Sequence, residues 1–132
     1  MEDCIFCKII DGEIPSNKVY EDDTLLAILD ITQTTKGHTL VIPKKHHRNL
    51  LEMPSQEVGL LFSKIPHIAN LLKDKLDAKG MNILQNNEEI AGQSVFHTHI
   101  HLIPRYDSSD GFDIHFTENE QNFDALIDKI LD

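Results

Sequence analysis

Positive charge, cysteine and long apolar runs are all scarce in this sequence of 132 residues. It has 12 Lys and Arg residues against 22 Asp and Glu, and the formal net charge of −10 argues against binding to a DNA or RNA backbone. No apolar run approaches the roughly 18 residues that a membrane span needs. The first residues carry acids and no basic segment. We therefore expect no signal peptide, no membrane association and a cytoplasmic location.

Length and composition predict a single domain over residues 1–132. Hydrophobic residues make up 40% of the chain and charged residues 26%, which is typical of a globular protein with a substantial core. No internal repeat or low-complexity segment interrupts it.

The only two cysteines, Cys4 and Cys7, form a Cys-x-x-Cys pair. In a cytosolic chain this spacing favours metal or redox chemistry over a structural disulfide. A thioredoxin-like redox site would follow a strand, and no strand is expected before this pair. Two cysteines provide half of a zinc site, so histidines would have to complete it. Two free thiols are the alternative.

Apolar periodicity predicts five strands and three helices. The strands are expected at residues 18–21, 24–29, 39–43, 81–86 and 95–106, and the last two should pair antiparallel. A short helix is expected at residues 4–10, a long helix capped by Ser55 up to about Lys79, and an amphipathic helix at residues 123–131. Pro66 should kink or break the long helix. We interpret His67 beside it as a histidine without a chemical role.

Three of the eight histidines alternate along the last predicted strand, at His97, His99 and His101. A period of two places them on one face of a strand, about 6.5–7 Å apart. Such a triplet is hard to explain by packing alone. It favours either a metal site or a histidine nucleophile that attacks phosphorus. Ser94 and the backbone amides near Gln93 favour the nucleophile, since they are short donors suited to phosphate oxygens.

A basic cluster at residues 44–48 stands out in this acidic sequence. It is either a solvated loop or part of a phosphate or metal neighbourhood, and the sequence favours neither.

The histidine segment resembles the His-φ-His-φ-His-φ-φ signature of the histidine triad (HIT) superfamily, with Thr98 a mild departure at the first φ position. Residues 4–10, 30–31 and 37–46 resemble the Hint-like branch, typical of bacterial HIT family proteins. The similarity covers about residues 3–106. It implies an α+β meander with a five-stranded antiparallel sheet, one long helix and short N- and C-terminal helices, in a homodimer.

The resemblance also implies hydrolysis at the α-phosphorus of purine nucleoside 5′-phosphoramidates or adenylylated compounds. His99 would be the nucleophile and form a nucleotidyl-histidine, and His101 would contact the phosphate and leaving group. Ser94 would donate to the phosphate, and His38 would support the histidine cluster. The alternatives are a diadenosine polyphosphate hydrolase and a nucleotide-sensing or protein-binding module with incidental hydrolysis.

Nine positions are implied to bind the nucleotide: Phe6, Ile9, Asp30, Ile31, Asn86, Gln93, Ser94, His99 and His101. Phe6 and Ile9 could equally be core residues, and Asp30 could be only a turn residue at the end of a strand. The resemblance further implies a structural zinc ion held by Cys4, Cys7, His46 and His97, with His47 as an alternative ligand.

Overall fold

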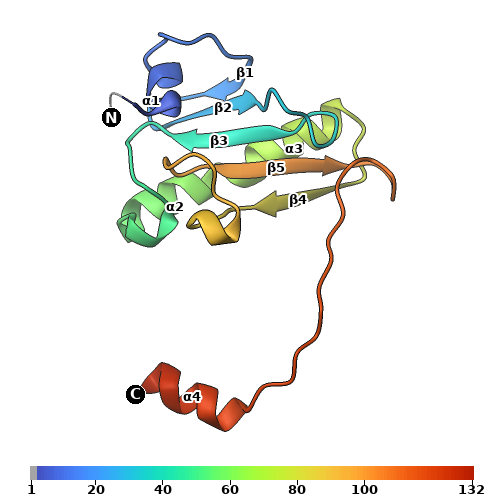
Figure 1. Ribbon diagram of the computed structural model, residues 1–132. Helices are drawn as coiled ribbons and strands as arrows, with labels where there is room; N and C mark the ends of the chain where they lie inside the picture. The colour runs from blue at the N-terminus through green and yellow to red at the C-terminus, as the bar shows by residue number, and fades with distance from the viewer. Residues whose placement is uncertain (1–2) are drawn as a thin grey trace.

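The computed structural model describes residues 3–132 and contains one five-stranded antiparallel sheet (Figure 1). Its order is β1-β2-β3-β5-β4. The strands are β1 (Lys18–Glu21), β2 (Leu25–Leu29), β3 (Thr39–Pro43), β4 (Gly80–Leu84) and β5 (Ile100–Arg105). The predicted α+β class is confirmed, and so is the antiparallel pairing of the last two strands.

The sheet carries an apolar core on each of its faces. One face packs against α2 (Ser55–Ser63) and α3 (Ile65–Lys75) and buries Ala27, Val41 and Ile100. The other face is covered by α1 (Ile5–Ile10), whose Phe6 and Ile9 pack against residues of β2 and β3. The two faces therefore differ, since one has a pair of helices and the other a single short helix (Figure 1).

The predicted long helix is in fact two helices, α2 and α3, divided at Lys64. Pro66 lies in the first turn of α3, where its missing N–H is tolerated, so the chain begins a new helix instead of bending the old one. The predicted end near Lys79 is wrong, because α3 ends at Lys75 and Gly80 already begins β4. Ser55 is the first helical residue and not the cap.

Strand β5 is shorter than predicted, so His97 and His99 lie ahead of it. The strand β3 pairs with β5 only as far as Ile100, and β4 only as far as His101. The pairing with β3 ends there because the next backbone groups of the two segments form hydrogen bonds elsewhere, one with a side chain and one with the loop after β3. The Pro43 carbonyl accepts from the His97 ring, and the Thr98 N–H donates to the His47 carbonyl at 2.9 Å. Only His101 therefore lies within the strand, although the rings of all three histidines lie on the α1 side of the sheet.

The remaining elements are short. Cys4 caps α1, because its Sγ accepts from the Cys7 N–H. Two 3-10 helices, η1 (Leu50–Glu52) and η2 (Glu89–Ala91), occupy loops that the sequence left without structure. The predicted C-terminal helix forms as α4 (Phe123–Leu131), but all of its residues are exposed. Among residues 3–132, no helix has both the length and the apolar character to cross a membrane.

Candidate functional site

The histidines form a row of touching rings beneath α1. His101 lies on β5 opposite Leu40 of β3, so it faces the same side of the sheet as the core under α1. Neighbouring rings along the row have centroids 4.8–6.0 Å apart. In order, the rings belong to His38, His101, His99, Phe6, His97 and His46. The two ends of this row differ: one end borders a cavity, and the other end lies beside the two cysteines.

His99 is held as a neutral imidazole with one free nitrogen. Its Nδ1–H donates to the carbonyl of His97 at 2.7 Å, which leaves Nε2 with a lone pair. Burial lowers the pKa of His99, while the bond to His97 and the charge of Asp30 oppose that shift. A neutral ring with an oriented, unprotonated Nε2 is what a nucleophilic histidine requires.

His38 and His101 form a second ordered pair. The Thr34 N–H donates to His38 Nδ1 at 3.3 Å, so the hydrogen of His38 lies on Nε2 and donates to His101 Nδ1 at 2.9 Å. The hydrogen of His101 must then lie on its own Nε2. Burial lowers the pKa of His101 to about 4, helped by the nearby His99 and His38 rings. His101 therefore presents a neutral N–H donor next to His99.

Asp30, His38 and His101 also lie close enough together to hold a metal ion. The bond from Thr34 argues against that use, because it places the hydrogen of His38 on the nitrogen that would coordinate. Asp30 Oδ2 lies 3.7 Å from this His38 Nε2, and Asp30 Oδ1 accepts from the Thr32 N–H at 2.8 Å.

A cavity of about 260 Å³ opens beside His99 and His101, between α1 and the end of β2. It brings together seven of the residues predicted to bind a nucleotide: Phe6, Ile9, Asp30, Ile31, Ser94, His99 and His101. Most of its lining is apolar, and its polar lining residues are Asp30, Thr32, Ser94, His99 and His101. A larger hollow of about 430 Å³ lies on the α2–α3 face near Met53 and Leu61 and contains none of the predicted site residues.

Two of the predicted nucleotide-binding residues lie outside this cavity. The Gln93 side chain is buried and uses both of its polar atoms inside the protein, donating to the carbonyls of Arg48 and Val95 and accepting from Glu88 and Asn49. Asn86 lies against Gly92, with Nδ2 3.5 Å from the Gly92 carbonyl. In this structure both residues shape the loop that precedes Ser94.

A further set of residues that the sequence did not single out holds the same loop. Glu88 has a positive φ of 78°, and its carboxylate accepts two bonds from Arg48, at 2.9 and 3.0 Å, and one from Asn49, at 2.6 Å. The Arg48 guanidinium also stacks on Phe96, 4.2 Å from the ring centre. No local pattern marks these residues, because Glu88 and Arg48 are 40 positions apart. Part of the basic cluster thus has a structural role.

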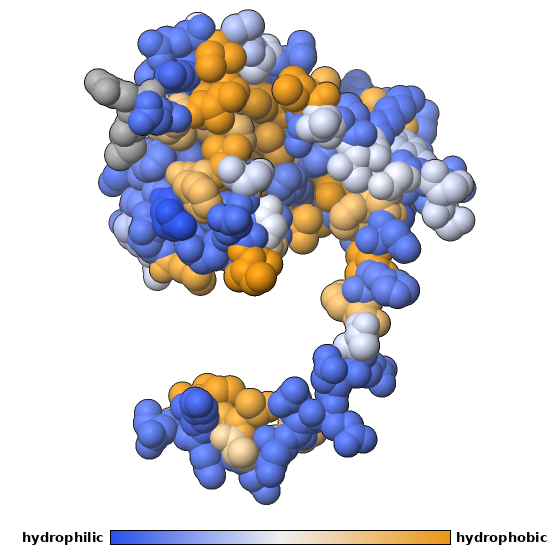
Figure 2. Space-filling view, viewed as in Figure 1, coloured by the Kyte–Doolittle hydropathy of each residue, from blue (hydrophilic) through white to orange (hydrophobic). Residues whose placement is uncertain are grey.

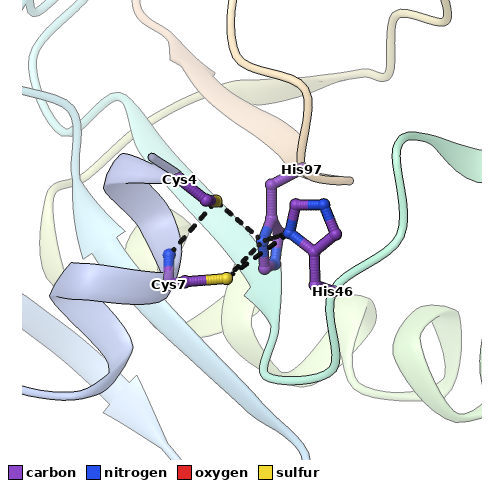
Figure 3. A group of neighbouring side chains, drawn as sticks. All are labelled: Cys4, Cys7, His46 and His97. Carbon is purple, nitrogen blue, oxygen red and sulfur yellow. Dashed lines mark hydrogen bonds between the residues drawn. The ribbon is translucent and has the colours of Figure 1, made fainter. Parts of the chain in front are cut away.

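The other end of the row is a group of four potential metal ligands (Figure 3). The Nε2–H of His97 donates to the Pro43 carbonyl at 2.7 Å, so His97 Nδ1 carries a lone pair. That nitrogen lies 3.3 Å from Cys4 Sγ, 3.5 Å from Cys7 Sγ and 3.1 Å from His46 Nδ1. Zinc bonds of about 2.3 Å to sulfur and 2.0–2.1 Å to nitrogen put tetrahedral ligand atoms roughly 3.3–3.8 Å apart. The four residues therefore fit a closed Cys₂His₂ site.

The pKa values of three of these four residues are shifted in the metal-free protein. Burial raises the pKa of the Cys7 thiol to about 11, and Cys4 adds to the shift. Burial also lowers the pKa of His97 to about 4 and that of His46 below its ordinary value. The alternative ligand His47 points elsewhere, since its Nε2 lies 3.0 Å from Glu57 Oε1.

The chain is similar to a large group of known proteins. A family model for the HIT domain matches residues 11–108. "Protein hit" of Bacillus subtilis is 51% identical over 98% of this chain and 95% of its own length. An adenylylsulfatase of Arabidopsis thaliana is 50% identical over 78% of this chain and 52% of its own length. An adenosine 5′-monophosphoramidase of Saccharomyces cerevisiae is 43% identical over 93% of this chain and 75% of its own length.

Solved structures agree with the fold. A Streptococcus mutans protein superposes with a TM-score of 0.91 at 54% identity, covering 100% of this chain and 87% of its own. A HIT family member from Bacillus subtilis superposes with a TM-score of 0.91 at 47% identity, covering 98% and 95%.

Proposed function

Since this chain belongs to the HIT domain family, we propose that it hydrolyses purine nucleoside 5′-phosphoramidates or related adenylylated compounds at the α-phosphorus. The observation that carries the proposal is the orientation of His99. Its Nδ1–H is held by the His97 carbonyl, and its free Nε2 borders a cavity that also contains Asp30 and His101. The names of the yeast and Arabidopsis relatives support the same class of reaction at a nucleotide phosphate or sulfate linkage.

The reaction runs in two displacements. His99 Nε2 bonds to the α-phosphorus as the bond from phosphorus to the leaving nitrogen breaks. The leaving amine takes that electron pair and a proton from solvent, while the Nε2–H of His101, held by the 2.9 Å bond from His38 to His101 Nδ1, donates a hydrogen bond to the leaving nitrogen. Water then attacks the nucleotidyl-histidine and loses one proton to solvent, and the P–N bond breaks to release the nucleoside monophosphate and a neutral His99.

The other residues of the cavity bind the substrate in this proposal. Ser94 lines the cavity and donates to a phosphate oxygen. Asp30 accepts from the ribose hydroxyls, with Ile31 beside it, and the apolar side chains of Phe6 and Ile9 contact the purine. Phe6 is also a core residue, only 6% exposed, so in this proposal it both packs the core and contacts the purine.

Hydrolysis of adenosine 5′-phosphoramidate by purified wild type, His99→Gly and His67→Gln tests the proposal. We expect wild type and the control His67→Gln to release AMP, since His67 is exposed, packs against Tyr20 and is not among the residues that line the cavity. His99→Gly should be inactive and should regain activity with added imidazole. Full activity of His99→Gly contradicts the nucleophile. Turnover of diadenosine polyphosphates alone, or nucleotide binding without any turnover, favours one of the two alternatives.

We further propose that Cys4, Cys7, His46 and His97 hold a structural zinc ion. When bound, it would close a tetrahedral site and anchor α1 to the sheet. His97 links this site to the chemistry, because the carbonyl of the same residue orients His99. The zinc content of protein prepared without added metal should be about one ion per chain, and Cys4→Ser/Cys7→Ser should lack it and melt at a lower temperature. Zinc-free wild type that is unaffected by chelators contradicts the proposal.

A further inference from the structure

The loop between β2 and β3 (residues 30–38, the β2–β3 loop) places a backbone N–H against the His38 ring. Its two ends are joined, since the Asp30 N–H donates to the His38 carbonyl at 2.9 Å, and Gln33 Nε2 donates to both of their carbonyls, at 2.6 and 2.8 Å. The Thr34 N–H then donates to His38 Nδ1 at 3.3 Å. The bonds between the ends do not hold the middle of the loop, which is fixed by contacts from another part of the chain.

The end of β5 holds the middle of the β2–β3 loop at two points. Thr35 Oγ1 donates to the Pro104 carbonyl at 2.6 Å, and Thr35 is buried. The Tyr106 hydroxyl donates to the Lys36 carbonyl at 2.7 Å. Figure 1 shows the loop and the end of β5 together at one end of the sheet. The bonded residues are 69 and 70 positions apart, so no local pattern in the sequence marks this contact.

Gly111 adds a third contact, directly on Thr34. Its φ is +114°, and a Cβ on it would collide with the Thr34 carbonyl oxygen. The preceding residue, Asp110, fixes this position, because its side chain is 5% exposed and accepts from Arg105 Nε at 3.0 Å and from the Tyr106 N–H at 2.8 Å. After this turn the chain is exposed and stands clear of the body (Figure 2). The position of Gly111 is therefore set by β5.

The bond from Thr34 distinguishes two arrangements of the His38–His101 pair. The 2.9 Å contact between His38 Nε2 and His101 Nδ1 needs one hydrogen, and either ring can supply it. In the first arrangement His38 supplies it, and His101 carries its own hydrogen on Nε2. In the second, His101 Nε2 has a lone pair, and the Nδ1–H of His38 would face the Thr34 N–H, donor against donor. Asp30 Oδ2, 3.7 Å from His38 Nε2, also favours the first arrangement but lies beyond hydrogen-bond distance.

We propose that Gly111 and the two hydroxyl bonds to the end of β5 position Thr34 and thereby select the first arrangement. They hold the β2–β3 loop so that the Thr34 N–H faces His38 Nδ1. A loop released from β5 would turn this N–H away, and the two arrangements would then compete. In the first arrangement the Nε2–H of His101 can donate to the leaving nitrogen. That role of His101 rests on the proposed function, whereas the selection between the two arrangements needs no substrate.

The histidine nitrogen chemical shifts of the isotope-labelled full chain test the proposal, because they report which nitrogen of each ring carries a hydrogen. Gly111→Ala is compared with Gly12→Ala, since Gly12 also has a positive φ, +83°, but a Cβ there would meet nothing within 4 Å. Both substitutions strain the backbone, and only the first pushes on Thr34. Gly111→Ala should bring at least about a tenth of the protein into the second arrangement, and Gly12→Ala should keep the wild-type shifts. Wild-type shifts in a folded Gly111→Ala overturn the proposal.

A second pair of variants tests the same point if the first glycine variant does not fold. Thr35→Val/Tyr106→Phe removes the two hydroxyls that hold the β2–β3 loop. Its matched control is Tyr20→Phe/Thr24→Val, which removes two hydroxyls that donate to a carboxylate of the β1–β2 turn, at 2.8 and 2.9 Å. The loop variant should move the shifts of His38 toward the second arrangement, and the control should not. Unchanged shifts in the loop variant, or equal changes in both, overturn the proposal.

Hydrolysis of adenosine 5′-phosphoramidate separates the positioning role from the proposed function. If wild type releases AMP, the kcat of Gly111→Ala should fall in proportion to the population of the first arrangement, and that of Gly12→Ala should equal wild type. A kcat that does not follow this population overturns the link to the leaving nitrogen. A change of arrangement in a protein that hydrolyses no substrate supports the positioning role and contradicts the proposed function alone.

Discussion

Lowering the pH from 7.5 to 5.0 should destabilise the fold through His101. This histidine lies on β5 against His38 and His99, and burial there lowers its pKa from 6.5 to about 4. Between these two values the unfolded chain binds a proton at this position and the folded chain does not. The contribution of His101 to stability is therefore complete above pH 6.5 and is lost as the pH falls toward 4.

The pKa shift of His101 sets how much free energy of unfolding is lost. A difference of about 2.5 pKa units corresponds to about 3 kcal/mol once the pH is below both values. At pH 5.0 the difference in proton binding amounts to about 2 kcal/mol of lost unfolding free energy. His101→Gln removes the titrating ring, so the variant should lose about 2 kcal/mol less than wild type over the same interval.

Urea denaturation at pH 7.5 and 5.0 measures this difference. His67→Gln is the matched control, since it removes an exposed histidine that packs against Tyr20. It should show the same pH-dependent loss as wild type. Protonation-sensitive contacts away from His101 and its neighbours His38 and His99 affect all three proteins alike and cancel in the comparison. An equal loss in His101→Gln and wild type refutes the reasoning.

Three further predictions concern stability and use urea denaturation at pH 7.5. Phe6→Ala should cost about 3–5 kcal/mol and Phe6→Leu less than about 1.5, and equal small costs contradict a core role for Phe6. Gly37→Ala should destabilise the fold by about 1–3 kcal/mol, because the φ of Gly37 is +92° and a Cβ there would collide with Leu76. Gly59→Ala is the matched control: it lies in α2 with open space around it, and it should stabilise the fold by about 1 kcal/mol. Glu88→Gly should be more stable than Glu88→Ala, because φ 78° and ψ 155° favour glycine; the reverse order contradicts strain at this position.

Much of this architecture follows from local patterns in the sequence. Continuous apolar runs mark β2 and β3, which are buried on both faces, and helical spacing marks α1 and α4. The motif around His99 was sufficient to predict the family that the HIT domain match then showed. These features depend on residues close together in the chain, so sequence alone determines them.

Other features depend on contacts between distant segments. The start of β5 is set by where β3 stops pairing and by the bond from Thr98 to His47. The alternation of the histidines predicted one strand face, but this pairing separates His97 and His99 from the strand. Gln93 is a further case, since only packing against Arg48 and Asn49 turns it away from the cavity.

The different roles of the three histidines show what the sequence determined and what the tertiary structure decided. The sequence determined that three imidazoles alternate near Ser94 and that two cysteines stand near the N-terminus. Only the tertiary structure decided which hydrogen each ring carries, because the partners of the rings are the Pro43 carbonyl, the His97 carbonyl and His38. Those partners turn one ring toward the cysteines and leave another with a free nitrogen at the cavity. A hydrogen bond fixes a tautomer, and its partner is chosen by the fold.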